Sequence, residues 1–179
     1  MTSTAANATS SRALPADKIL VAIVFVLALA AIAGAWGSQL FGGLVPCELC
    51  LAQRQAYYWG LPVLALILIF WNRLPLTVWY IAVLVAAGIF AWSTYMGTYH
   101  AGVEWGWWPG PTACTGTGGD LSFGDLSSGN IEKVIPCDQV QWRDPVIQFS
   151  LAGYNALLSA LNVVLLLAAM VAQAQRRRV

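Results

Sequence analysis

Charged side chains are scarce in this chain. Asp, Glu, Lys and Arg make up 9% of its 179 residues, whereas 59% of the residues are hydrophobic. A soluble domain usually has about 25% charged residues, so the composition excludes an ordinary water-soluble globule. The only lysines are Lys18 and Lys133, and the formal net charge is +1. Because nucleic-acid binding depends mostly on neutralising phosphates, a nucleic-acid partner is not expected.

Histidine and cysteine are also few, which limits the metal and haem chemistry open to the chain. A Cys₄ zinc site usually has two closely spaced pairs, and only Cys47 and Cys50 form such a pair. Covalent haem attachment needs a histidine directly after Cys-x-x-Cys, but Leu51 stands there. No metal site is therefore expected. The four cysteines are Cys47, Cys50, Cys114 and Cys137.

Hydrophobic runs without any charge predict four helices. Crossing about 30 Å of hydrocarbon takes roughly 20 helical residues. The runs cover residues 19–40, 55–71 (or from nearer 50), 76–98 and 146–172. A cleaved signal peptide is an alternative for the first run, but that run is longer than the usual core of about 7–15 residues. The sequence therefore predicts an all-α membrane protein, a four-helix up-and-down transmembrane bundle.

Basic residues set the predicted orientation. One side of the membrane would hold six of them with one acid, Asp17, while the other side would hold three with seven acids. Basic residues near span ends mark the cytoplasm, so both termini are predicted cytoplasmic and all four cysteines lie on the outer side. The predicted divisions are a tail at 1–18, one four-span domain at 19–172 with an outer loop at 102–145, and a basic tail at 173–179. The six basic residues are Arg12, Lys18, Arg73, Arg176, Arg177 and Arg178.

A Cys-x-x-Cys pair stands at the predicted start of the second helix. Proline is favoured at the first helical position, so Pro46 predicts a helix with Cys47 and Cys50 in its first turn. The positive end of a helix stabilises a thiolate. Arg54 lies on the same face by i, i+3, i+7 spacing, where its guanidinium would favour the Cys50 thiolate. Snorkelling of Arg54 to the lipid headgroups is the alternative.

Four cysteines on an oxidising side favour two disulfides. Proximity favours Cys47–Cys50 and leaves Cys114–Cys137, with crossed pairings still open. Both bridges can be purely structural, although so short a loop at Cys47–Cys50 would stabilise the fold little. His100 lies at the outer end of the third span and is either a satisfied interface residue or a catalytic one. Polar residues at 155, 159 and 162 lie on one helical stripe that suits interhelical hydrogen bonds.

These residues together resemble the DsbB family of bacterial disulfide-bond formation proteins. The resemblance covers about residues 19–170 and depends on the order of several motifs. They are Pro46-Cys47-Glu48-Leu49-Cys50 with Arg54, then Tyr99-His100, Pro136-Cys137-Asp138, Gln141-Trp142 and Gly153-Tyr154-Asn155. Gln53 departs from the pattern, because an acidic residue can stand before the arginine in that family.

The resemblance implies a thiol:quinone oxidoreductase of the bacterial inner membrane that reoxidises a periplasmic thioredoxin-fold partner of the DsbA type. Cys114 would be attacked by the partner, and Cys137 would leave and exchange with Cys47. Cys50 would pass electrons to a bound quinone (ubiquinone or menaquinone) held by Arg54 and His100. Two alternatives stay open. One is an enzyme like vitamin K epoxide reductase, whose Cys-x-x-Cys lies late in the bundle, and the other is a structural four-span protein with two outer-loop disulfides.

Overall fold

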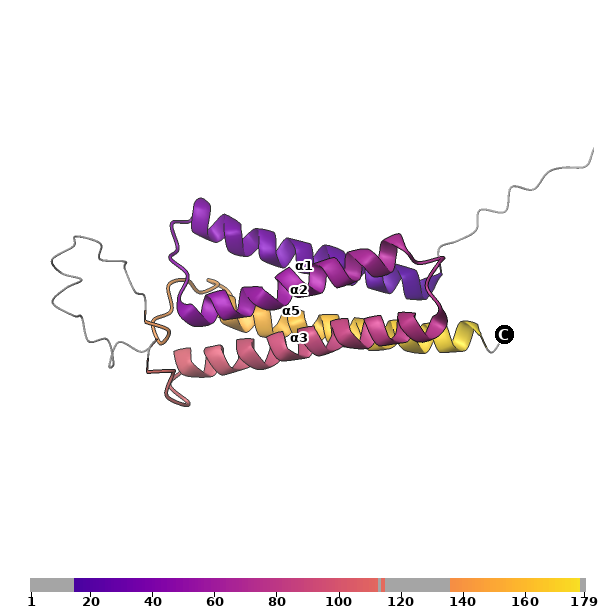
Figure 1. The fold of residues 1–179 in the computed structure, drawn as a ribbon. Helices are drawn as coiled ribbons and strands as arrows, with labels where there is room; N and C mark the ends of the chain where they lie inside the picture. Colours follow the sequence, from indigo (N-terminus) through magenta and orange to yellow (C-terminus); the bar gives the residue numbers. More distant parts are fainter. Residues whose placement is uncertain (1–14, 113, 115–135, 178–179) are drawn as a thin grey trace, which may run out of the picture.

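In the part of the chain that the structure describes, four helices form a bundle and run up and down (Figure 1). The computed structural model describes residues 15–112, 114 and 136–177, so most of the predicted outer loop and both chain ends lie outside the described residues. The helices are α1 (Ala16–Leu40), α2 (Glu48–Ile69), α3 (Leu76–Glu104) and α5 (Leu151–Arg176). The described part has no strand, only one bridge between Arg143 and Ser150. The all-helical prediction is confirmed.

Three of the helices, α1, α3 and α5, are long and apolar enough to cross a membrane. Large hydrophobic side chains are exposed along these helices, among them Val26, Ile81 and Val164, as expected for surfaces that face lipid. The second helix has 22 residues and includes polar side chains. Its passage through the membrane, the four-span topology and the division into tails and domain remain predictions.

The helix boundaries differ from the predicted ones. The second helix begins at Glu48, two residues after the start predicted from Pro46. It includes residues before the hydrophobic run at 55–71, because the polar side chains there are buried against other helices. The third continues past residue 98 to Glu104. The last begins at Leu151 rather than 146, because residues 145–147 form a turn in which the Asp144 carboxylate accepts hydrogen bonds from backbone N–H groups.

Each helix packs against two neighbours: α1 and α3 each contact α2 and α5. The main core lies between them and contains Val24, Leu64, Phe90 and Leu166, all with no exposed surface. At one end of the bundle Arg176 forms an ion pair with the buried Asp17, with 3.0 Å between Nη2 and Oδ2. The start of α1 and the end of α5 therefore lie together, and the start of α2, with Cys47 as its N-cap, lies at the opposite end of the bundle (Figure 1).

Helices α3 and α5 approach each other closely at Gly97. A Cβ atom at this position would lie 2.8 Å from the backbone nitrogen of Ala156 and 2.9 Å from Nδ2 of Asn155. Small residues allow membrane helices to approach this closely. Gly97 therefore allows Asn155 to reach the interior of the bundle near the cysteines.

Candidate active site

Cys47 and Cys50 lie at the start of α2. Cys47 is the N-cap residue, and its sulfur accepts a hydrogen bond from the backbone N–H of Cys50 at 3.3 Å. Pro46 therefore precedes the cap, and the prediction that it is the first helical residue was wrong, because the Cys47 sulfur takes the capping role that ends the extended segment. The Cys47 side chain is buried and Cys50 is half-buried. The Cys50 sulfur and burial together raise the pKa of the Cys47 thiol.

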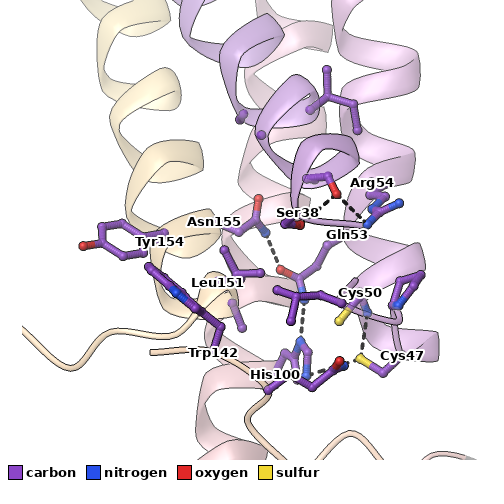
Figure 2. Close-up of a pocket in the computed structure, with 18 of the residues that line it drawn as sticks. Ser38, Cys47, Cys50, Gln53, Arg54, His100, Trp142, Leu151, Tyr154 and Asn155 are labelled. Carbon is purple, nitrogen blue, oxygen red and sulfur yellow. Dashed lines mark hydrogen bonds between the residues drawn. The ribbon is translucent and has the colours of Figure 1, made fainter. Parts of the chain in front are cut away.

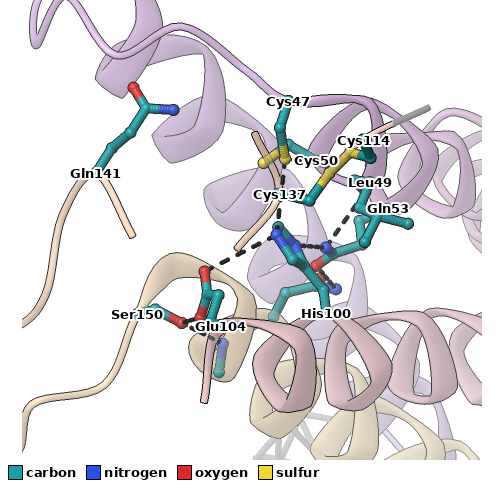
Figure 3. Close-up of polar contacts among 12 residues, drawn as sticks. Cys47, Leu49, Cys50, Gln53, His100, Glu104, Cys114, Cys137, Gln141 and Ser150 are labelled. Atoms are coloured by element: carbon teal, nitrogen blue, oxygen red, sulfur yellow. Dashed lines mark hydrogen bonds and ion pairs between the residues drawn. A yellow bond between two sulfur atoms is a disulfide. The ribbon is translucent and has the colours of Figure 1, made fainter. Parts of the chain in front are cut away.

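A disulfide joins Cys114 to Cys137, as predicted, with 5.3 Å between the Cα atoms. The backbone N–H of Cys137 also donates to the carbonyl of Cys114 at 2.5 Å. The second predicted bridge is not formed, since Cys47 and Cys50 are free thiols in this structure. The sulfurs of Cys47, Cys114 and Cys137 all lie within 4.8 Å of one another (Figure 3). A free thiol therefore lies directly beside a disulfide, which is the arrangement that thiol–disulfide exchange requires.

A pair of reciprocal hydrogen bonds aligns the two cysteine segments. The Gln141 side chain accepts from the backbone N–H of Val45 at 3.1 Å and donates to the Val45 carbonyl at 2.5 Å. Val45 lies two residues before Cys47, and Gln141 lies four residues after Cys137. One amide side chain therefore links the segment before α2 to the end of the outer loop.

His100 is buried beside Cys47, with 3.6 Å between its Nε2 and the cysteine sulfur. Its other ring nitrogen, Nδ1, lies 2.7 Å from the amide nitrogen of Gln53. Glu104, one turn further along α3, has a carboxylate oxygen 3.9 Å from Nε2 and a hydrogen bond from Ser150, the N-cap of α5 (Figure 3). The structure therefore places the sequence-predicted His100 next to the sulfurs.

Sequence reasoning missed Glu104 and gave Gln53 no role beyond its departure from the family pattern. The signal for Glu104 was the i, i+4 spacing from His100, which places both on one face of a helix. The signal was hidden because the third helix was expected to end at residue 98. Once α3 continues to Glu104, a carboxylate enters the site.

A series of side-chain hydrogen bonds continues from Gln53 into the bundle (Figure 2). The Gln53 carbonyl oxygen accepts from the Asn155 amide at 2.7 Å. The Asn155 oxygen in turn accepts from the Tyr57 hydroxyl at 2.6 Å, and Ser159 lies 3.1 Å from that hydroxyl. The predicted interhelical hydrogen bonds of Asn155 and Ser159 are therefore present, whereas Asn162 is buried without a hydrogen-bond partner within the described residues.

Arg54 is buried and directed at α1. Its guanidinium donates to the Gln39 side chain at 2.7 Å and to the Ala35 carbonyl at 3.0 Å, and it lies 5.4 Å from the ring centre of Trp36. Only 8% of the residue is exposed. The guanidinium is therefore bound within the bundle, and this geometry does not match snorkelling to lipid headgroups.

A pocket of about 320 Å³ opens beside these groups, a volume at the lower end of the range for small-molecule sites, about 300–1,000 Å³. Small residues of α1 form one wall, and α5 with the segment 139–142 forms another (Figure 2). Cys50, Arg54 and His100 all line it. A mostly apolar pocket with a few hydrogen-bonding groups next to a thiol suits an apolar ligand that carries hydrogen-bond acceptors.

The ligand atoms of Cys47, Cys50 and His100 also lie within 4.8 Å of one another. A metal-bound histidine normally donates its second ring N–H to an acceptor. Here the amide nitrogen of Gln53, a donor, faces that second nitrogen. The surroundings of His100 therefore favour thiol chemistry over cation binding.

The fold and the site together define a helical membrane protein with a buried thiol–disulfide centre. A sequence model described as "DsbB: Disulfide bond formation protein DsbB" matches residues 17–169, most of the chain. The chain therefore belongs to the DsbB family and is a disulfide-forming membrane oxidoreductase. No curated protein and no solved structure matches it.

Proposed function

We propose that the protein is a thiol:quinone oxidoreductase that reoxidises a periplasmic thioredoxin-fold partner of the DsbA type. One observation carries the proposal: Cys47 lies between the Cys114–Cys137 disulfide on one side and Cys50 on the other, at the wall of a pocket that contains Arg54. Electrons from a soluble dithiol enter through the outer-loop pair, Cys114 and Cys137. They leave to a quinone in the bilayer through the helix pair, Cys47 and Cys50.

The exchange steps follow from the order of the sulfurs. A thiolate of the partner attacks Cys114, a mixed disulfide between the partner and Cys114 forms, the Cys114–Cys137 bond breaks, and Cys137 leaves as a thiolate. When the helix pair is oxidised, Cys137 attacks Cys47, a Cys47–Cys137 bond forms, and Cys50 leaves as a thiolate. Attack on Cys47 is favoured because its sulfur lies within 4.8 Å of the Cys137 sulfur. The positive end of α2 and the Arg54 guanidinium stabilise the charge left on Cys50.

The residues that would hold the quinone are Cys50, Arg54 and His100, all of which line the pocket. When bound, a quinone supplies an acceptor for two electrons and two protons. The Arg54 guanidinium is already oriented by Gln39 and Ala35, so it offers a fixed positive charge to a carbonyl oxygen. The mostly apolar lining favours a lipid-soluble acceptor, either ubiquinone or menaquinone.

Mixing the purified protein with a reduced thioredoxin-fold dithiol and a soluble ubiquinone or menaquinone analogue tests the proposal. Quinone absorbance should fall with the wild-type protein and stay constant with Cys50→Ser. The same variant is its own folding control, because its Cys114–Cys137 disulfide should still form a mixed disulfide with the partner. Full quinone reduction by Cys50→Ser would contradict the assignment.

The two alternatives make different predictions. A vitamin K epoxide reductase-like enzyme has its Cys-x-x-Cys late in the bundle, whereas here the pair begins α2. A structural protein would keep both disulfides closed under mild reductant, so rapid opening of one pair argues against it. The proposed location is the bacterial inner membrane, with both termini cytoplasmic and the cysteines periplasmic. Reporter fusions at residues 1 and 179 test this orientation, and a periplasmic reporter signal from either would contradict it.

A further inference from the structure

The hydrogen-bond partners of Gln53 determine which way round its amide lies. Its Nε2 is 3.3 Å from the carbonyl of Leu49, which only accepts hydrogen bonds. Its Oε1 is 2.7 Å from Nδ2 of Asn155, which only donates. A flipped amide would oppose donor to donor and acceptor to acceptor at these two contacts. The nitrogen of Gln53 therefore faces His100.

The orientation of Asn155 is fixed in the same way. Its oxygen lies 2.6 Å from the Tyr57 hydroxyl, and its nitrogen lies 3.4 Å from the backbone carbonyl of Ser93 as well as near Gln53. Two backbone carbonyls, at Leu49 and Ser93, can only accept hydrogen bonds. They therefore determine which groups donate and which accept in the series of hydrogen bonds from Asn155 through Gln53 to His100. All links that determine the Gln53 amide lie on α2, α3 and α5.

This orientation decides where the proton of His100 is. The Gln53 amide donates to Nδ1 at 2.7 Å, so Nδ1 carries a lone pair and the neutral ring carries its proton on Nε2. The Nε2–H then faces the Cys47 sulfur at 3.6 Å, with a Glu104 oxygen at 3.9 Å as a further acceptor. In the opposite tautomer Nε2 would present a lone pair to the sulfur, which favours a thiol and repels a thiolate.

We propose that Gln53 is a positioning residue that holds His100 as an Nε2–H donor to Cys47 and so stabilises the Cys47 thiolate during exchange with the outer-loop disulfide. The step is the reverse of the one that closes the cycle, in which Cys114 displaces Cys47 from Cys137 and Cys47 leaves as a thiolate, and it balances within the chain. Cys47 loses its proton to solvent and attacks Cys137, the Cys47–Cys137 bond forms, the Cys114–Cys137 bond breaks, and the electron pair leaves on Cys114. The inference rests on the proposed exchange between the two cysteine pairs but not on the quinone.

The tautomer can be observed directly because His100 is the only histidine in the chain. The full-length protein, labelled with ¹⁵N in the histidine ring, should show a bare nitrogen and a protonated one. Couplings to the ring carbon protons identify each nitrogen. We expect the bare nitrogen to be Nδ1. A proton on Nδ1, or rapid averaging between both nitrogens, would overturn the proposal without any variant having to fold.

A matched pair of substitutions then tests the role of Gln53. Gln53→Glu replaces the donor by a carboxylate, which should draw a proton onto Nδ1. Gln55→Glu makes the same change at an exposed position of the same helix and should leave both ring signals where they are. Nδ1 that stays bare in Gln53→Glu would show that residue 53 does not set the tautomer.

The exchange itself is measured in Cys50→Ser, which needs neither partner nor quinone. There, Cys47 can react only with the Cys114–Cys137 disulfide, and acid quenching with peptide mapping gives the rate of Cys47–Cys137 formation. Adding Gln53→Met, which keeps the side-chain length without the amide, should slow this rate about tenfold, since one hydrogen bond to an ionised group contributes at least that factor. An unchanged rate contradicts the positioning role. If the wild-type protein fails to reduce quinone while exchange between Cys47 and the outer-loop disulfide has the expected rates, only the proposed function is contradicted.

Discussion

Gly97→Ala tests the close approach of α3 and α5 and its link to the thiol site. The added methyl would lie 2.8 Å from the Ala156 nitrogen and 3.0 Å from its Cα, and backbone atoms cannot rotate away as a side chain can. The two helices must therefore separate. Overpacking of this kind costs about 1–3 kcal/mol. Alanine in place of glycine within a helix offsets about 1 kcal/mol of that cost.

Gly88→Ala is the matched control, because it lies on the same helix and nothing lies within 4 Å of a Cβ at that position. Gly88→Ala should therefore only gain stability, by the roughly 1 kcal/mol by which alanine is favoured over glycine within a helix. The two variants should then differ by about 1–3 kcal/mol in the free energy of unfolding, with Gly97→Ala the less stable. Unfolding in mixed detergent micelles, followed by circular dichroism, measures this difference. Equal stabilities would refute the argument that the helices are in contact at Gly97.

The same pair has a functional readout. The new methyl would also lie 2.9 Å from Nδ2 of Asn155, the atom that holds the Gln53 amide. Displacing Asn155 frees that amide, so Gly97→Ala should slow exchange between Cys47 and the outer-loop disulfide, whereas Gly88→Ala should not. Normal exchange in a destabilised Gly97→Ala protein would show that the site does not depend on this helix contact.

Two further predictions concern the segment before α5. Ser150→Ala removes the cap that accepts the Gly153 N–H at 3.2 Å and should lower the free energy of unfolding by about 1 kcal/mol; no loss on thermal unfolding would contradict the capping role. Hydrogen bonds from the backbone N–H groups of Ile147 and Val146 hold the pKa of Asp144 below its ordinary value, so its contribution to stability is present above the ordinary carboxyl pKa and is lost as pH falls through the lowered one. Asp144→Asn should therefore be less stable than wild type at neutral pH, with the difference disappearing in acid, and a pH-independent difference would argue against it.

The sequence predicted the helical bundle well because its signals are local. Uninterrupted hydrophobic runs determine where helices form, and four runs were visible. The boundaries were less accurate wherever a polar residue is buried by tertiary contacts. Gln53 and Arg54 stand just before the hydrophobic run at 55–71, yet both are buried within α2 because Asn155 and Gln39 bind them from other helices. No local pattern reports partners that distant in the chain.

The site was predictable in its residue types but not in its connections. The cysteines, Arg54 and His100 follow from motif and resemblance, and the structure gathers them around one pocket. Glu104 was missed because it required the extension of α3 past its predicted end. The direction of the hydrogen bonds that link Asn155, Gln53 and His100 depends on which amide atom faces which partner, and the sequence carries no information on this.

The paired hydrogen bonds between Gln141 and Val45 have a kinetic consequence. By aligning the two cysteine segments, they fix Cys47 and Cys137 at a high effective concentration relative to each other. Both sulfur-bearing residues are almost fully buried, as is Cys114. A small thiol in solution must therefore compete with a neighbour that is already in place. Selectivity for the internal route then comes from competition between rates, and it should weaken when Gln141 no longer joins the two segments.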